Sequence, residues 1–554
     1  MMKRISVLAL AMSLAACGGS DGDGGIIAGG TGSGSTLLQT TDTGAGGAGT
    51  TGATPATPAT PATPATPGAG AQGATPATPA TPATPATPAT PGAGAPGATP
   101  PVATIPNPIP ITPATAASTA FLTTAYQTGL AEIRLAQLAP TRAESTGVQE
   151  YARAMIEHHS IVNTQIQQLA QQKGVTLPTD ITADQAAAVT RLSALTGLPF
   201  DRDFMWQTVT AHRTAVADAM RRARAGDDQN ARYLAAIALP LLKTHLAVGE
   251  DILQRLDPAA FIAFTYQSSL AEIEWAELAV ERATDEDVRR FAQNMIDEHT
   301  EANSRITAFA ETKELPLPDE IAPEQQAIAE DLARFSGADF DRAYMEVNVV
   351  AHAKAVRYAR TQMTNEGRDV DVRAVARSLE PDLAGHLAHA SELARNITPS
   401  FLYSAAQSNL AEIRFGYLGA LRSTNASVMG YGQRMATEHT PVQLQLEQLA
   451  QTQGVVLPIE LSPEQQLVYG TLVVAQGQQF NAGFALYNER LHDRAIERFT
   501  EETQRPTGTQ TQAFAQSLLP TLTAHRDEAR TLLSGLGGEV TTIMQQIQAL
   551  RDAL

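Results

Sequence analysis

The sequence predicts an all-α protein in which three four-helix bundles follow one another behind a long low-complexity segment. Two observations predict this class. A text of about 135 residues, the size of one ordinary domain, recurs three times after residue 119. Within each copy the apolar side chains are spaced by three and four residues, which is the period of an amphipathic helix. Repetition of one helical sequence pattern predicts tandem copies of one helical fold.

The chain begins with features typical of a bacterial export signal. A basic start precedes an apolar stretch over residues 5–16, which is shorter than the roughly 20 residues that a bilayer span requires. The stretch ends in a Leu-Ala-Ala-Cys tetrad that resembles the lipobox of bacterial lipoproteins, and Cys17 is the only cysteine. We therefore expect a lipoprotein signal peptide over 1–16 and a membrane anchor through lipidated Cys17. The alternative is an ordinary signal peptide with an incidental cysteine.

Residues 17–118 form a low-complexity linker. Ala-Thr-Pro triplets fill two tracts, 53–67 and 74–91, and large apolar side chains are too few to offset the entropy of ordering. Proline at every third position favours an extended polyproline II conformation. The sequence thus predicts a disordered stalk rich in proline, threonine and alanine. Because Gly18 follows the cysteine, the sorting rule of lipoproteins favours the outer membrane of a bacterial envelope over the inner one.

The bundles are expected at 119–256, 259–396 and 399–534, and a short amphipathic C-terminal helix at 538–554. In the first copy the apolar spacing predicts helices over 119–143, 147–172, 199–225 and 228–254. The short link Gly226–Asp228 should make the last two helices antiparallel. The second and third helices are joined by a long crossover with a short helix starting near Thr182, which leaves its flanking helices parallel in the ferritin-like pattern. Three polar residues recur at the start of the third helix and are interpreted as capping residues: Asp201, Asp341 and Asn481.

Nine of the eleven histidines lie at three positions that recur about every 140 residues. In the first copy His159, His212 and His245 lie on the apolar faces of the second, third and fourth helices. Glu132 shares a face of the first helix with small side chains. Counted from the helix ends at 1.5 Å per residue, these four side chains lie at similar heights in the bundle. The corresponding residues of the other copies are Glu272, His299, His352 and His386, and Glu412, His439, His492 and His525.

Three imidazoles and one carboxylate form a ligand set with a clear chemical use. Neutral imidazoles offer lone pairs and the carboxylate partly neutralises a divalent cation, so the set suits zinc, iron, copper, manganese or nickel. The residues just before the second-helix histidine are candidates for outer partners of the ligands: Glu157, His158, Asp297, Glu298 and Glu438. The alternative is a buried hydrogen-bond network without metal, which the repeat would preserve equally.

The order of motifs resembles that of one known family. The motifs that carry the resemblance are, in order, Phe-Leu, Leu-Ala-Glu-Ile, Met-x-x-[Asp/Glu]-His, Leu-Pro, Phe-Asp-x-x-[Phe/Tyr]-Met and Leu-Pro-x-Leu-x-x-His. The sequence resembles the family of domain of unknown function 4142, a ferritin-like family often labelled predicted outer-membrane protein. The resemblance covers residues 119 to about 534 as three tandem copies. It implies a ferritin-like four-helix bundle and an envelope location, and it supplies no established reaction.

The third copy departs from this pattern. Pro441 lies two residues after His439, where a helix-interior proline is expected to kink the helix, so the third site is the one expected to be degenerate. The pattern of di-iron carboxylate bundles, a Glu-x-x-His motif on each of two paired helices, is also absent, which argues against a ferroxidase.

Composition excludes one class of function, and three classes stay open. The formal net charge is −18, with 39 basic and 57 acidic residues and no basic patch, so nucleic acid is not an expected partner. The first open class is binding, buffering or sensing of a transition metal. The second is a metal-dependent oxidoreductase acting on superoxide or peroxide, because the ligand set resembles that of iron and manganese superoxide dismutases. The third is a non-metal structural or interaction module of the cell envelope.

Overall fold

The computed structural model describes residues 109–364, 369–505 and 510–536, all within one compact unit. This part of the chain consists of helices and connecting segments without a strand, which confirms the all-α prediction. None of the helices in these ranges is long and apolar enough to cross a membrane. The predicted signal peptide, Cys17 and the predicted helix at 538–554 lie outside the described residues.

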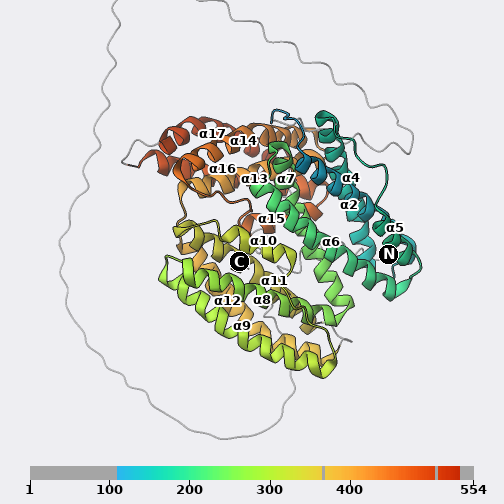
Figure 1. Ribbon diagram of the computed structural model, residues 1–554. Helices are drawn as coiled ribbons and strands as arrows, with labels where there is room; N and C mark the ends of the chain where they lie inside the picture. The colour runs from blue at the N-terminus through green and yellow to red at the C-terminus, as the bar shows by residue number, and fades with distance from the viewer. Residues whose placement is uncertain (1–108, 365–368, 506–509, 537–554) are drawn as a thin grey trace, which may run out of the picture. The chain divides into compact units, whose positions relative to one another are not determined.

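The first copy forms a four-helix bundle from the helices that the apolar spacing predicts (Figure 1). Its main helices are α2 (Ala116–Ala136), α4 (Thr146–Lys173), α6 (Gly197–Ala225) and α7 (Gln229–Leu256), and its short ones are α3 (Ala139–Arg142) and α5 (Ala183–Ser193). The prediction of one first helix over 119–143 is wrong. Pro140 has no N–H to continue the helical ladder, so α2 ends before it and Pro140 lies in the first turn of α3.

Two contacts show that the long crossover leaves α4 and α6 parallel, as predicted. At one end Ser145 N donates to Asp201 Oδ2 (2.8 Å). At the other end Lys173 Nζ lies 2.8 Å from Asp228 Oδ2, where α7 begins. Asp201 therefore does not cap its own helix, because its carboxylate lies in the second turn of α6 and holds the backbone at the start of α4. Asp341 does the same in the second bundle through Thr284 N (2.9 Å).

The second and third copies repeat this arrangement with an unbroken first helix. The second contains α8 (Pro258–Arg282), α9 (Glu286–Lys313), α10 (Pro323–Leu332), α11 (Gly337–Thr364) and α12 (Val370–Asn396). The third contains α13 (Phe401–Arg422), α14 (Ala426–Gln453), α15 (Pro463–Val474), α16 (Gly477–Thr503) and α17 (Gln510–Leu536). Asp257 alone joins the first two bundles: it ends α7, and its carboxylate accepts from Ala259 N at the start of α8 (3.2 Å). Pro441 lies inside α14 and does not end it.

The last residues of the predicted linker belong to the first bundle. Ile109 is buried, and Thr112 N donates to Asn230 Oδ1 on α7 (3.1 Å). The predicted linker boundary at 118 is therefore wrong for residues 109–118. Ile109 supplies a large apolar side chain of the kind that the Ala-Thr-Pro tracts lack, and its burial stabilises this contact.

A layer of polar side chains lies in the core of each bundle, and in the second and third bundles it separates two apolar clusters. In the second bundle one cluster contains Met295 and the other contains Ile306, and His299 lies between them on α9. The core of the third bundle is divided in the same way, whereas one apolar cluster of the first bundle contains both Val209 and Val216 and so extends past His212. The candidate ligands thus lie in a low-dielectric interior among apolar side chains.

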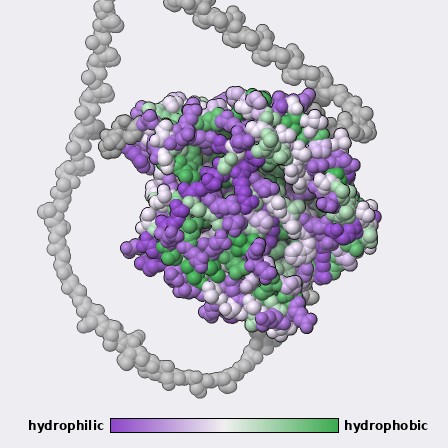
Figure 2. Space-filling model, in the orientation of Figure 1, coloured by the Kyte–Doolittle hydropathy of each residue, from purple (hydrophilic) through white to green (hydrophobic). Residues whose placement is uncertain are grey.

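The surface is polar, and charged side chains connect the bundles. Among the described residues only Ile111, Leu198 and Val370 are exposed large hydrophobics, and Figure 2 shows polar side chains spread over the face in view. Arg224, at the end of α6, donates to Asp331 Oδ2 of the second bundle (2.9 Å) and to the carbonyl of Leu457 in the third (2.6 Å).

Candidate metal centres

The second bundle contains the most regular of the three clusters. Glu272, His299, His352 and His386 come from α8, α9, α11 and α12 and meet in the polar layer. Glu272 Oε2 lies 3.0 Å from His299 Nε2 and 3.2 Å from His352 Nε2. One ring nitrogen from each of the three histidines lies within 4.8 Å of the others. The predicted convergence of four side chains from four helices is confirmed here.

Hydrogen bonds on the outer side of each ring turn a lone pair inward. His352 Nδ1 contacts the carbonyl of Asn348 (2.9 Å), which can only accept, so the proton is on Nδ1. The Ser269 hydroxyl donates to the His299 carbonyl (3.3 Å) and therefore accepts from His299 Nδ1 (3.0 Å). His386 Nε2 donates to Glu298 Oε2 (2.6 Å). Within the described part of the chain, the inward nitrogens of these three rings have no hydrogen-bond partner.

The electrostatics of this cluster favour a cation. Burial lowers the pKa of His352 to about 4, so the ring is neutral near pH 7. Burial alone would raise the pKa of Glu272, but the positive charge that His352 and His299 carry when they are protonated lowers it to about 2, so the carboxylate is ionised near pH 7. Acceptor atoms that face one another at 3.0 to 3.2 Å without a proton between them repel, and a cation among them relieves that repulsion.

The first bundle brings its four predicted residues together as well. Glu132 Oε2 lies 2.8 Å from His159 Nε2, and Glu132 Oε1 lies 3.3 Å from His212 Nδ1. His212 Nδ1 also contacts the carbonyl of Thr208 (2.9 Å), and His212 Nε2 lies 3.3 Å from His245 Nδ1. All four predicted residues are buried.

The third bundle forms a cluster despite Pro441, although its rings are turned differently. His439 presents Nδ1 to Glu412 Oε2 (2.7 Å), whereas the second-helix histidines of the other bundles present Nε2 to their glutamates. His439 Nε2 lies 3.1 Å from His525 Nδ1, and His492 Nε2 lies 3.9 Å from Glu412 Oε1. These residues are buried.

The residue before each second-helix histidine contacts the fourth-helix histidine. The contacts are Glu298 to His386 (2.6 Å), Glu438 to His525 (2.8 Å) and His158 to His245 (2.8 Å). Three of the five residues predicted to contact the ligand histidines from outside the cluster therefore do so. The other two lie elsewhere: Asp297 accepts from Gln293 (3.1 Å), and Glu157 lies 3.4 Å from Arg422.

Some contacts at the clusters were not expected from the sequence. Ser269 and Asn409 bind the second-helix histidine in the second and third bundles, and the first bundle has Gly129 at this position. Arg422 Nη1 of the third bundle lies 2.6 Å from His158 Nε2 in the first. Burial, and then the charge of Arg422, lower the pKa of His158 to about 3, so this ring is neutral.

The second cluster is reached by a cavity. It has a volume of about 360 Å³ and is lined by Glu272, His299 and His386 together with the acidic Glu301 and Asp382. The cavity beside the third cluster measures about 20 Å³. A small cation or molecule therefore has more room at the second cluster than at the third.

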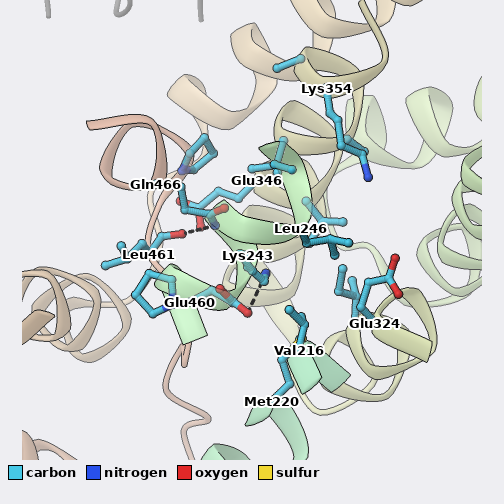
Figure 3. A pocket seen from close by; sticks show the side chains of 18 of the residues that line it. Val216, Met220, Lys243, Leu246, Glu324, Glu346, Lys354, Glu460, Leu461 and Gln466 are labelled. Carbon is cyan, nitrogen blue, oxygen red and sulfur yellow. Dashed lines mark hydrogen bonds and ion pairs between the residues drawn. The ribbon is translucent and has the colours of Figure 1, made fainter. Parts of the chain in front are cut away.

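A separate apolar cavity lies where helices of all three bundles meet (Figure 3). It measures about 330 Å³ and is lined by side chains such as Val216, Leu246 and Leu461, with the ion pair of Lys243 and Glu460 (2.8 Å) beside them. The cluster histidines and the glutamates of the three polar layers do not line it. The candidate metal centres and this cavity are thus different places.

Comparison with known proteins agrees with the internal repeat. A family model described as Domain of unknown function (DUF4142) matches residues 107–252, 253–393 and 394–532. Neither a curated protein nor a solved structure matches the chain. Each matched stretch contains one complete cluster.

Proposed function

Since the chain belongs to the DUF4142 family, whose description assigns no activity, we propose its function from the clusters: it is a metal-binding protein of the bacterial cell envelope. Each bundle holds one transition-metal ion through one glutamate and three histidines. The observation that carries the proposal is the second cluster, where three imidazole lone pairs and a carboxylate oxygen converge without a donor among them. A bound ion supplies the missing positive charge.

The donor set limits which ions fit. Three nitrogens and one carboxylate oxygen suit zinc, iron, copper, manganese or nickel, and they disfavour calcium and magnesium, which prefer oxygen ligands. Buffering, storage or sensing of such an ion requires only these contacts. Outer carboxylates such as Glu298 orient the ligating ring and raise its basicity.

A second function is favoured by the cavity at the second cluster. A space of about 360 Å³ beside Glu272 and His299 gives a small molecule access to an ion held there. This access supports a metal-dependent oxidoreductase acting on superoxide or peroxide. Turnover of either compound by the metal-loaded chain, compared with the Glu272→Gln variant, tests this activity.

The envelope location forms part of the proposal and is supported by sequence alone. The apolar stretch over 5–16 and Cys17 support a lipid anchor, and Gly18 supports the outer membrane. Labelled palmitate incorporated into the wild-type chain and not into Cys17→Ala would support the anchor. Equal labelling of both chains would contradict it.

Metal analysis of the full chain tests the proposed function. After reconstitution with each candidate ion and removal of excess, we expect about three bound ions per chain and a higher thermal midpoint than in chelator. The variant with Glu132→Gln, Glu272→Gln and Glu412→Gln should lose both effects. His389→Gln is the matched control, because His389 is exposed and lies outside the clusters. Less than one ion per chain, with a thermal midpoint unmoved by chelator, would leave the non-metal structural module as the function.

A further inference from the structure

We infer that the three sites are not equivalent, and that Arg422 of the third bundle acts through His158 to hold the metal affinity of the first site below that of the second. This inference rests on the proposed function. It follows from the direction of the hydrogen bonds around His245 and His386, the fourth-helix histidines of the two bundles.

In the second bundle the outer partner prepares the ring for an ion. Glu298 can only accept, so His386 Nε2 carries the proton and His386 Nδ1 presents a lone pair to the cluster. The Glu298 side chain is 52% exposed, so water solvates its other oxygen and nothing opposes this arrangement. An ion enters without any change of hydrogen bonding.

In the first bundle His158 is the residue that contacts the fourth-helix histidine, and the hydrogen bond between them runs in the opposite direction. A guanidinium group has only N–H donors, so Arg422 donates to His158 Nε2 (2.6 Å). Because His158 Nε2 accepts this hydrogen bond, Nε2 carries no proton, and the single ring proton of His158 is on Nδ1. His158 Nδ1 then donates to His245 Nε2 (2.8 Å).

The chain of donors continues into the cluster. Because His245 Nε2 accepts, the His245 proton is on Nδ1, and this nitrogen donates to His212 Nε2 (3.3 Å). His212 Nδ1 completes the chain by donating to the Thr208 carbonyl (2.9 Å). The inward nitrogens of His245 and His212 are thus engaged with each other, whereas those of the second bundle are free to bind.

Metal binding at the first site therefore carries an extra cost. His245 offers Nδ1 to an ion only when its proton is on Nε2, which then faces the proton on His158. If His158 changes tautomer as well, two donors face each other at Arg422. Every route loses one hydrogen bond, and loss of an outer contact lowers metal affinity roughly 10- to 100-fold.

The arginine that causes this difference has a counterpart that lacks the contact. Arg282 ends α8 as Arg422 ends α13, and Arg282 donates to the carbonyls of Ala333 (2.6 Å) and Phe335 (3.3 Å). Arg422 makes the equivalent contact with the Ala475 carbonyl (3.4 Å) and in addition reaches His158. Arg282 is therefore a matched control.

Full-length chains that keep a single site test the inference. His352→Gln with His492→Gln leaves the first site, and His212→Gln with His492→Gln leaves the second. The Zn²⁺ dissociation constant of each chain is measured by competition with a chromogenic chelator, after circular dichroism shows that helicity is retained. We expect the first site to bind at least about tenfold more weakly than the second.

Two additions to the first-site chain should restore its affinity. His158→Glu supplies an outer acceptor and Arg422→Gln supplies an amide that can accept, so each should tighten Zn²⁺ binding about tenfold. Arg282→Gln in the second-site chain should leave its affinity unchanged. The imidazole ¹⁵N shifts of the metal-free wild-type chain give an independent readout, with the proton on Nδ1 of His245 and on Nε2 of His386.

The outcomes separate the inference from the proposed function. Equal affinities of the two single-site chains, or no gain from either addition, would overturn the inference and leave metal binding intact. A proton on Nε2 of His245 would also overturn it. Absence of binding in both chains, with Zn²⁺ and with each of the other candidate ions, would overturn the proposed function itself.

Discussion

Glu272→Gln should stabilise the metal-free protein, although it removes a buried carboxylate that contacts two histidines. The Glu272 side chain is buried, Oε1 accepts from Ser268 Oγ (3.0 Å), and Oε2 faces the His299 and His352 nitrogens at 3.0 and 3.2 Å. At pH 8 the His352 ring is neutral, because burial lowers its pKa to about 4. An amide in place of Oε2 donates its N–H to His299 Nε2, where the carboxylate cannot.

The size of the effect follows from this geometry. The exchange is isosteric, adds one neutral hydrogen bond worth about 1 kcal/mol, and removes a buried charge whose Oε2 lacks a donor. For a domain of this size, such a gain raises the thermal midpoint by roughly 2 to 5 °C. If protonated imidazoles instead held the carboxylate as a structural ion pair, the same change would leave a buried unpaired cation and cost roughly 3 to 5 kcal/mol.

The assay is thermal unfolding of the full chain at pH 8 in chelator, with His389→Gln as control. A lower midpoint for Glu272→Gln would refute the reasoning and favour the metal-free network. With metal present the order should reverse, because the wild-type chain gains stability from its ion and the variant does not.

Three further outcomes are expected. Burial lowers the pKa of His352 and of His492 to about 4, so between pH 6.5 and 4 the unfolded chain binds these protons and the folded chain does not. The free energy of unfolding of the metal-free protein should therefore fall by about 3 kcal/mol per histidine as the pH drops through this window. A urea midpoint that does not change with pH would contradict this. Phe415→Ala, at a fully buried ring of the third bundle, should cost roughly 3 to 5 kcal/mol in urea unfolding and spare the metal of the second-site chain, and loss of that metal would count against independent sites. Asp341→Ala should cost roughly 1 to 3 kcal/mol because Thr284 N loses its acceptor, and an unchanged thermal midpoint would show that this contact contributes nothing.

The members of the clusters could be predicted because the signals are local and repeated. Helical periodicity places His159 and His245 on apolar faces, and the same positions recur in the other two copies. A rise of 1.5 Å per residue then suffices to align them with Glu132. The positions of these side chains depend on the geometry of single helices, and this geometry can be predicted from the local sequence.

Contacts that depend on packing between elements could not be predicted. Arg422 and His158 are 264 positions apart, and no period connects them. Asp201 lies where a helix cap is expected, but only the parallel packing of α4 and α6 brings it to Ser145. Gly129, Ser269 and Asn409 occupy one position with three different side chains, so the repeat carried no signal there.

The junction at Asp257 has a mechanical consequence. With one residue between α7 and α8, and with that residue fixed by Ala259 N and by the indole of Trp206 (3.2 Å), the first two bundles share a stiff coupling in place of a swivel. Tension applied to the N-terminal end of the chain is passed from α7 to α8 through this single extended residue, with almost no slack to absorb it.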